Sequence, residues 1–321
     1  MFTLYLLLDR VTARMAHGKM RMESSDGTSR TIPLEGITHV VLDRRAHITM
    51  PLIFALLEQG TTFSFVNGKG ELVASMGGDV LNKKRFRKQK ERLNDNPVCC
   101  SSIKDLVREK IRRQRWLVRR YAERNKSKAL TKIDDKLTGY YANSAGMVPK
   151  ELRDLECRAT KLYFSAFTKI LDQNLWPWKG RSDSIASDPV NAILNLGYAF
   201  LEREVRIAVI GAHLSPGIGF FHTDEGRKDP LVYDMMEYFY QTVIDSFVLR
   251  LLNCGVLSPE DFVYDEKTGC RLTDKAFPVW SAAYEEYMIK PVQDFDGKTP
   301  RDIIRREIWD FAVIQFIDID N

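Results

Sequence analysis

The chain has 321 residues, of which 44% are apolar and 28% are charged, with 19 glycines and 12 prolines. This length predicts two domains that can each bury a core, and this composition excludes disordered, collagenous and coiled-coil proteins. Five cysteines without Cys-x-x-Cys spacing argue against a disulfide framework and a thiolate zinc site. No apolar run is long enough to cross a membrane or built as an export signal, so we expect a cytoplasmic protein without membrane contact.

The net charge of +5 is unevenly distributed along the chain. Residues 83–128 hold 18 Lys and Arg residues against five acids, a local net charge of +13, so the rest of the chain sums to −8. A basic segment flanked by acidic segments predicts a region that binds a polyanion, with carboxylates reserved for another task.

Residues 1–80 are predicted to form a small β-sandwich-like domain. Short runs rich in β-branched and aromatic residues recur at 2–8, 37–42, 61–66 and 71–75, and turn signals stand at 25–27 and 67–70. One helix is expected among them, capped by Thr49, with Pro51 in its first turn and Gly60 at its end.

Residues 81–321 show helical periodicity almost throughout and are predicted to form a larger, all-α catalytic domain, which makes the protein α+β. Helices are expected over 101–124, 155–171, 189–210, 232–252 and 299–316. The helix over 189–210 is apolar on nearly every side and is expected to be central, with Asp188 as its cap. The first of these helices also carries a stripe of arginines, about 120° from its apolar stripe: Arg108, Arg112, Arg115 and Arg119.

Polar residues follow one edge of the predicted helix over 232–252 with 3-4-4 spacing: Asp234, Glu237, Gln241 and Asp245. Two carboxylates one turn apart can converge on a hard divalent cation such as Mg²⁺ or Mn²⁺. His222 ends a glycine-broken turn just upstream, and Glu156 lies on a separate predicted helix. Each of these residues taken alone is more often a solvated or hydrogen-bonded side chain. Together with the arginine stripe, they suggest a metal-assisted enzyme acting on nucleic acid.

Several long motifs resemble those of the CRISPR adaptation integrases, the metal-dependent endonucleases that insert new spacers into CRISPR arrays. They are SDPVNAILNLGYA at 187–199, GIGFFH at 217–222 with LVYDMME at 231–237, and LRLLN at 249–253 followed by the blocks at 261–262 and 272–273. The segment at 48–51 that leads into the first predicted helix is also similar, so the resemblance covers nearly the whole chain.

The resemblance implies that Glu156, His222 and Glu237 bind Mg²⁺ or Mn²⁺, with Asp234 as an accompanying catalytic acid. It implies that donor DNA 3′ ends are joined to a CRISPR repeat by phosphodiester transesterification, as part of adaptive antiviral defence. The chain departs from the family where 110–114 reads KIRRQ in place of Lys-x-x-Asn-Gln, and where Tyr240 replaces a frequent arginine. DNA contacts are predicted for a set of cationic residues: Lys110, Arg112, Arg113, Arg115, Arg119 and Arg181.

The implied partners are double-stranded DNA, as donor fragment and as CRISPR repeat, a second copy of the chain bound through the N-terminal domain, and a small ferredoxin-like adaptation protein. Two other functions stay open at this point. A metal-dependent nuclease of branched or damaged DNA would use the same site without integration. A non-enzymatic nucleic-acid-binding scaffold would keep the carboxylates for structural reasons only.

Overall fold

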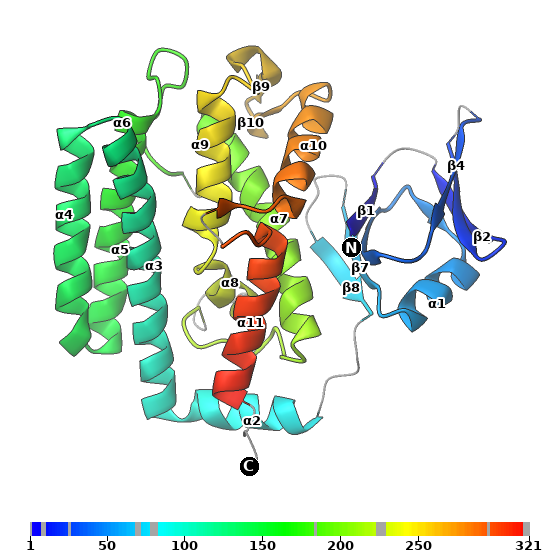
Figure 1. Cartoon of the computed structure of the whole chain (residues 1–321), viewed down its shortest axis with the longest axis horizontal. Coiled ribbons are helices and arrows are strands. Elements are labelled where there is room, and N and C mark those ends of the chain that lie inside the picture. Colours follow the sequence, from blue (N-terminus) through cyan, green and yellow to red (C-terminus); the bar gives the residue numbers. More distant parts are fainter. Residues whose placement is uncertain are drawn as a thin grey trace.

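The computed structural model describes residues 2–7, 11–24, 27–67, 72–77, 83–182, 185–222, 229–293 and 296–316. An N-terminal β region lies beside a larger, mostly helical region (Figure 1), so the predicted α+β fold is confirmed. The division proposed at residue 80 falls among residues 78–82, outside the described part of the chain, and stays a prediction.

The described strands of the β region form two four-stranded sheets. The first has the order β1 (Phe2–Leu6), β5 (Ile37–Asp43), β7 (Thr62–Val66) and β8 (Leu72–Met76), with only β8 antiparallel to its neighbour. The second has the order β4 (Ser29–Pro33), β3 (Lys19–Glu23), β2 (Thr12–Ala16) and β6 (His47–Ile48). One core joins both sheets, because Met20 from the second sheet and Val40 and Phe63 from the first belong to the same buried cluster.

Helix α1 (Met50–Glu58) covers this core with two fully buried residues, Leu52 and Leu56. Thr49 precedes α1 as predicted, but its side chain makes no capping hydrogen bond. Gly60 follows the helix with φ +81°, a left-handed conformation that glycine adopts without strain.

The predicted strand runs correspond to β1, β5, β7 and β8, whereas β2, β3, β4 and the two-residue β6 were missed. Strands β2, β3 and β4 are rich in arginine and methionine and hold few of the β-branched residues that signal a strand: Thr12, Thr31 and Ile32. His17 and Gly18, with φ of 50° and 73°, form a two-residue turn between β2 and β3. The turn signals at 25–27 and 67–70 lie partly outside the described residues.

The described α-helices of the helical region range from about one turn to about eight turns: α2 (Lys83–Asn94), α3 (Asn96–Arg124), α4 (Lys128–Asn143), α5 (Pro149–Ser165), α6 (Phe167–Ile170), α7 (Pro189–Gly211), α8 (Pro230–Met236), α9 (Ser246–Asn253), α10 (Ala276–Ile289) and α11 (Pro300–Phe316). Helices α3, α4 and α5 pack side by side, while α7 runs through the middle of the region (Figure 1). Helix α7 is buried over most of its length, as expected, and the Asp188 carboxylate caps it by accepting the Asn191 N–H at 2.9 Å.

Short elements complete this region: the 3₁₀ turns Ser144–Gly146 and Pro259–Asp261 and a hairpin of β9 (Phe262–Asp265) and β10 (Gly269–Leu272). The hairpin adds strands to a domain that was predicted to be all-α. The helix expected over 155–171 begins earlier, at Pro149, and ends at Ser165 before α6. Within the described ranges, no helix combines the length and apolar content needed to cross a bilayer.

The prediction of one continuous helix over 232–252 is wrong. Helix α8 ends at Met236, a turn follows, and a π-helical segment, η2 (Tyr240–Asp245), leads into α9. The π-helical segment packs tightly against α7 at Gly197. A Cβ atom at that position would lie 2.5 Å from Ile244 Cγ2, so the close approach requires glycine. The extra residue in a π turn rotates the following side chains, so Glu237 and Asp245 no longer share an edge.

Candidate active site

Asp234, on α8, is a buried acceptor that ties the glycine-containing turn before it to the helix. Its Oδ2 accepts the N–H groups of Phe220 at 2.7 Å and Phe221 at 3.1 Å, and its Oδ1 accepts the N–H of His222 at 3.0 Å. Only glycine fits at position 219, because a Cβ there would lie 2.7 Å from Asp234 Oδ2. The carboxylate therefore fixes the backbone that carries His222.

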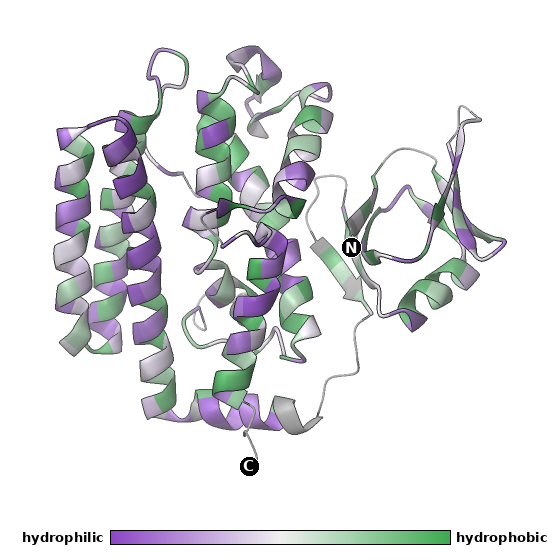
Figure 2. Ribbon diagram, in the orientation of Figure 1, coloured by the Kyte–Doolittle hydropathy of each residue, from purple (hydrophilic) through white to green (hydrophobic). Residues whose placement is uncertain are grey.

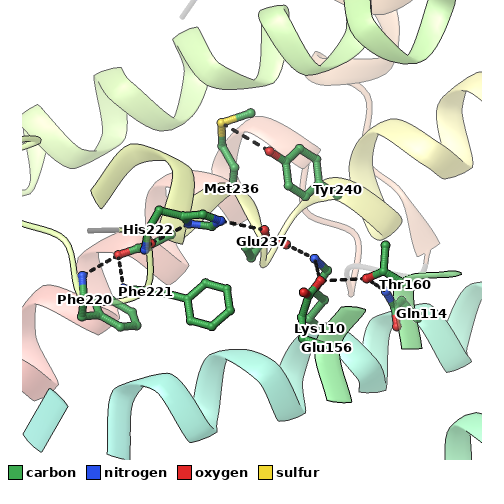
Figure 3. Close-up of polar contacts among 11 residues, drawn as sticks. Lys110, Gln114, Glu156, Thr160, Phe220, Phe221, His222, Met236, Glu237 and Tyr240 are labelled. Atoms are coloured by element: carbon green, nitrogen blue, oxygen red, sulfur yellow. Dashed lines mark hydrogen bonds and ion pairs between the residues drawn. The ribbon is translucent and has the colours of Figure 1, made fainter. Parts of the chain in front are cut away.

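The same carboxylate also orients the His222 ring. Its Oδ1 lies 2.8 Å from Nδ1, and since a carboxylate only accepts, Nδ1 carries the proton. In the neutral ring, Nε2 then presents a lone pair, and it faces Glu237 Oε1 at 3.6 Å (Figure 3). An imidazole held by a carboxylate on one nitrogen, with the other nitrogen directed at an anionic oxygen, is typical of a metal-ligating histidine.

Glu237 and Glu156 converge on the ammonium group of Lys110, which extends from α3 (Figure 3). Lys110 Nζ contacts Glu156 Oε1 and lies 2.7 Å from Glu237 Oε2, and all three side chains are largely buried. Thr160, one turn beyond Glu156 on α5, donates to Glu156 Oε1 at 2.8 Å. Gln114 in turn donates to Thr160 at 3.1 Å, so α3 supports Glu156 at two points.

The electrostatics keep Glu156 and Lys110 ionised. Burial alone would raise the pKa of Glu156, but the charge and hydrogen bond of Lys110 and the Thr160 hydroxyl outweigh it and lower the pKa below its usual value. Burial would lower the pKa of Lys110, but the carboxylates of Glu237 and Glu156 more than offset it and raise that pKa. Lys110 is therefore a cation at neutral pH, and Glu156 is an anion.

The donor chemistry of this cluster fits a divalent metal ion. Two carboxylates contact the Lys110 ammonium, and an imidazole nitrogen faces one of those carboxylates at 3.6 Å, which offers the mixed oxygen and nitrogen donors that Mg²⁺ and Mn²⁺ accept. Within the described residues, no three His, Cys, Asp or Glu side chains are gathered closely enough to hold a metal as they stand. The Lys110 ammonium lies between Glu156 and Glu237, where a metal ion bound by these two carboxylates would lie.

Two of the predicted DNA contacts lie in the interior. Lys110 is 7% exposed, and Arg113 is 8% exposed and directed toward α11 and the turn after α8. Arg113 donates to the Tyr238 carbonyl and pairs with Glu307 at 2.6 Å. It also pairs with Glu109. Lys110 and Arg113 are therefore placed to connect the helices around the site. The charge pattern of the sequence did not indicate this structural role.

The other predicted DNA contacts have partners of their own. Arg115 and Arg119 both pair with Asp134 on α4, at 3.3 and 2.9 Å. Arg112 pairs with Glu109, yet the side chains of Arg112 and Arg119 remain 60% and 52% exposed. Arg181 donates to the side chains of Asn191 and Asn195 on α7. Hydrophilic colouring extends along α2 and α3 in Figure 2, in line with the basic segment of the sequence.

Asp245 and Gln241 were predicted on the same helix edge as Glu237. In the structure they lie on the η2 segment, and Asp245 contacts side chains other than those of the site. Asp245 is fully buried and accepts hydrogen bonds from Tyr163 on α5 and Tyr198 on α7. Gln241 is also buried, at 3% exposure. Sequence reasoning predicted Lys110 as a DNA contact and did not predict its position between Glu156 and Glu237; a signal for burial was its place next to the apolar stripe that includes Ile111.

Comparison with known proteins decides the family. The model of the family described as CRISPR associated protein Cas1 matches residues 4–286. This chain belongs to the Cas1 family. The recognition made from the motifs at 187–199, 217–222 and 231–237 is thereby confirmed.

Curated relatives of the Cas1 family are moderately similar to the chain. CRISPR-associated endonuclease Cas1 1 of Methanospirillum hungatei is 33% identical over 156 residues, which cover 49% of this chain and 46% of the relative. The Cas4/Cas1 exonuclease–endonuclease fusion of Rhodospirillum rubrum is 31% identical over 268 residues, which cover 80% and 45%. CRISPR-associated endonuclease Cas1 1 of Moorella thermoacetica is 27% identical over 292 residues, which cover 88% and 85%. The chain thus spans about half the length of the first two relatives.

Solved structures share the fold at low identity. A CAS1 protein from Thermotoga maritima superposes with a TM-score of 0.78 at 20% identity, covering 98% of this chain and 96% of that one. A casposase bound to integration product reaches 0.82 at 18% identity, covering 100% and 92%. A chain of a Cas6-RT-Cas1–Cas2 complex reaches 0.78 at 20% identity, covering 98% and 34%. These matches establish the Cas1 fold over the whole chain.

Proposed function

We propose that the chain is a metal-dependent DNA endonuclease and integrase that joins donor DNA 3′ ends to a CRISPR repeat during spacer acquisition. The observation that carries the proposal is that Glu156 and Glu237 both contact Lys110, and that His222, oriented by Asp234, faces Glu237. Membership of a family whose curated relatives are named endonucleases supports the nuclease part. The fold shared with a casposase bound to integration product supports the joining part.

In this proposal, Glu156, His222 and Glu237 hold Mg²⁺ or Mn²⁺. When bound, the ion would neutralise charge on the phosphoryl oxygens and lower the pKa of the attacking 3′-hydroxyl or water. The chain supplies the positioning. Asp234 holds the His222 ring in one tautomer, and Thr160, itself held by Gln114, restrains the carboxylate of Glu156.

The cations on α2 and α3 are proposed to bind DNA phosphates. Arg112 and Arg119 keep more than half of their side-chain surface exposed. Their guanidinium groups can therefore bind phosphate oxygens, either in place of the carboxylates that they now contact or in addition to them. Contacts of this kind read the duplex backbone and not the bases, so donors of many sequences should bind, with strong salt dependence.

The proposed assembly is a homodimer formed through the β region, together with a small ferredoxin-like adaptation protein. A structural neighbour solved as part of a Cas6-RT-Cas1–Cas2 complex supports a Cas-protein partner. In such an assembly two copies of the site would act on the two ends of one donor DNA.

Strand joining tests the proposal directly. Labelled donor DNA is incubated with a repeat-containing plasmid and Mn²⁺, with and without the adaptation partner. Glu156→Ala, His222→Ala and Glu237→Ala should each reduce joining by at least about 1,000-fold while the fold is kept, because each removes a metal ligand. Glu286→Ala is the matched control, since Glu286 is an exposed glutamate on α10 that pairs with the exposed Lys290, and it should join at the wild-type rate.

Other outcomes would favour the alternative functions. Cleavage of branched DNA without any joining would indicate a nuclease that does not integrate. Retained joining in two of the three alanine variants would contradict the site. DNA binding without cleavage, with no thermal stabilisation by Mn²⁺, would indicate a scaffold.

A further inference from the structure

One cation of the protein already occupies the centre of the proposed metal site. Lys110 Nζ contacts Glu156 Oε1 and lies 2.7 Å from Glu237 Oε2. The two glutamates come from α5 and from the end of α8, and Lys110 comes from α3, so three separate elements meet at this one charge. Figure 3 shows the ammonium between the two carboxylates, with His222 approaching Glu237 from the other side.

A positive charge at this point is needed whenever no metal is bound. Two buried carboxylates that face one position repel each other, and leaving either one unpaired in the interior is costly. Lys110 removes this repulsion, so the two carboxylates can lie close together around one position without a metal.

The two contacts of Lys110 differ in strength. Glu156 Oε1 also accepts the Thr160 hydroxyl, so it is restrained independently of Lys110. Glu237 Oε2 is held by the Lys110 ammonium at 2.7 Å and, among the described residues, has no second hydrogen-bond donor. The Glu237 carboxylate is therefore free to change from one cation to another.

We propose that Lys110 is a stand-in cation: it assembles Glu156 and Glu237 in the metal-free protein and competes with the divalent ion for them. The proposal rests on the proposed function, because it takes these carboxylates as the metal ligands. Two cations cannot occupy one position, so metal binding requires the Lys110 ammonium to withdraw. A lysine suits this task, since its ammonium is a compact charge on a flexible four-carbon stem.

Isothermal titration of the full-length protein with Mn²⁺ tests the competition. Lys110→Met keeps much of the stem and removes the charge, so the dissociation constant for Mn²⁺ should fall by at least about tenfold as the competitor is lost. Lys110→Arg keeps the charge and should bind Mn²⁺ no more tightly than the wild type. An unchanged or higher dissociation constant for Lys110→Met would overturn the proposal.

Arg301→Met provides a control with matched chemistry. Arg301 is a buried cation between two carboxylates, Glu204 at 2.7 Å and Glu285 at 3.0 Å, outside the site. Its loss should leave the Mn²⁺ dissociation constant within about twofold of the wild type, because no site ligand is uncovered. An equal gain in Mn²⁺ affinity in both variants would mean that any carboxylate pair left without its cation captures Mn²⁺, and the stand-in role would be wrong.

Lysine labelling of the wild type provides a second test if Lys110→Met does not fold. Amine acetylation read by mass spectrometry should be slow at Lys110 without metal and at least about fivefold faster with Mg²⁺, as the ammonium withdraws. Lys290, whose side chain is 64% exposed, should label equally in both conditions. Equal labelling of Lys110 with and without Mg²⁺ would contradict the proposal.

The two levels of the proposal fail in different ways. If the wild type binds Mn²⁺ through Glu156 and Glu237 but Lys110→Met binds no tighter, only the stand-in role is lost. If neither the wild type nor Lys110→Met binds Mn²⁺, the proposed metal-dependent function is lost with it.

Discussion

At the scale of single residues, Asp234 does more than any other side chain to arrange the site. Its two oxygens take three backbone N–H groups and the His222 ring, so all nearby donors point at one carboxylate. A carboxylate can satisfy them because both of its oxygens accept. An amide of the same size cannot.

Asp234→Asn is therefore expected to disturb the site without removing a metal ligand. Its NH₂ group would face N–H donors, and the His222 tautomer would no longer be fixed. We expect Mn²⁺ affinity to fall about 10- to 100-fold, as for other residues that orient metal ligands, measured by isothermal titration. Asp310→Asn, on the exposed face of α11, should leave the affinity unchanged. Wild-type affinity in Asp234→Asn would show that His222 needs no orientation.

The sequence indicated which residues form the site but not how they contact one another. His222, Asp234 and Glu237 stand in motifs, so their proximity could be predicted from the chain. The position of Lys110 could not, because a basic stripe on an isolated helix carries no sign of which face is covered. That face is decided by Glu156 and Glu237, which come from elements far along the chain.

At the scale of elements, the break after α8 is the main departure from prediction. Neither proline nor glycine occurs in residues 237–245, so local propensity gave no reason to interrupt the helix. π-Helical segments arise where tertiary packing favours an inserted residue, and they are frequent at functional sites. Here the break leaves Glu237 at the end of α8, facing Lys110, and turns Asp245 toward Tyr163 and Tyr198.

Asp245 gives this element a pH dependence. Burial raises its pKa to about 6, although hydrogen bonds from Tyr163 and Tyr198 and the charges of Arg181 and Lys110 act to lower it. Since the folded pKa exceeds the unfolded one, the folded state binds the extra proton. The stabilisation is complete below the unfolded pKa and is lost as pH rises through the folded pKa of about 6.

Asp245→Asn should remove this dependence. Between about pH 4 and 7, the free energy of unfolding of the variant should rise relative to the wild type by up to about 3 kcal/mol, because the variant has no carboxylate to ionise. Urea unfolding across this pH range measures the difference. Asp302→Asn is a suitable control, since Asp302 is exposed at the start of α11. Parallel stability curves for Asp245→Asn and the wild type would contradict the assignment.

At the scale of the whole molecule, the β region contacts the helical region through the sheet that contains β1. Tyr5 on β1 stacks on Phe200 of α7, with ring centroids 5.8 Å apart, and its hydroxyl hydrogen-bonds to Glu285 of α10. Arg305 on α11 donates to Thr38 of β5 at 3.3 Å. These contacts set the orientation of the β region relative to the site.

Tyr5→Ala should loosen this orientation. Loss of a buried aromatic ring costs about 3 kcal/mol and loss of the partly buried Tyr5 ring should cost less, but the loss falls on the contact between the regions. Small-angle X-ray scattering should show a broader distribution of interatomic distances than in the wild type. Tyr264→Ala, which removes a ring that is 69% exposed on β9, should give the wild-type curve. An unchanged curve for Tyr5→Ala would show that other contacts suffice.

Two regions, their order and their fold classes followed from composition and periodicity. Their arrangement did not, because it depends on contacts such as Tyr5 with Phe200 and Arg301 with Glu204, whose residues are remote in sequence. The charge pattern likewise predicted that α3 carries many cations. It did not predict which of them are buried, and the structure shows that Lys110 and Arg113 are.

The stacking of Tyr5 on Phe200 has a consequence for the order in which the chain folds. During synthesis β1 leaves the ribosome early and finds β5 and β7 within the same small region, so the sheets can form first. Tyr5 must wait for α7 and α10 before its ring and hydroxyl are covered. Closing so long a loop is entropically costly and slow. Docking of the two regions is therefore expected to be a late step in folding, and the Tyr5 ring stays uncovered until then.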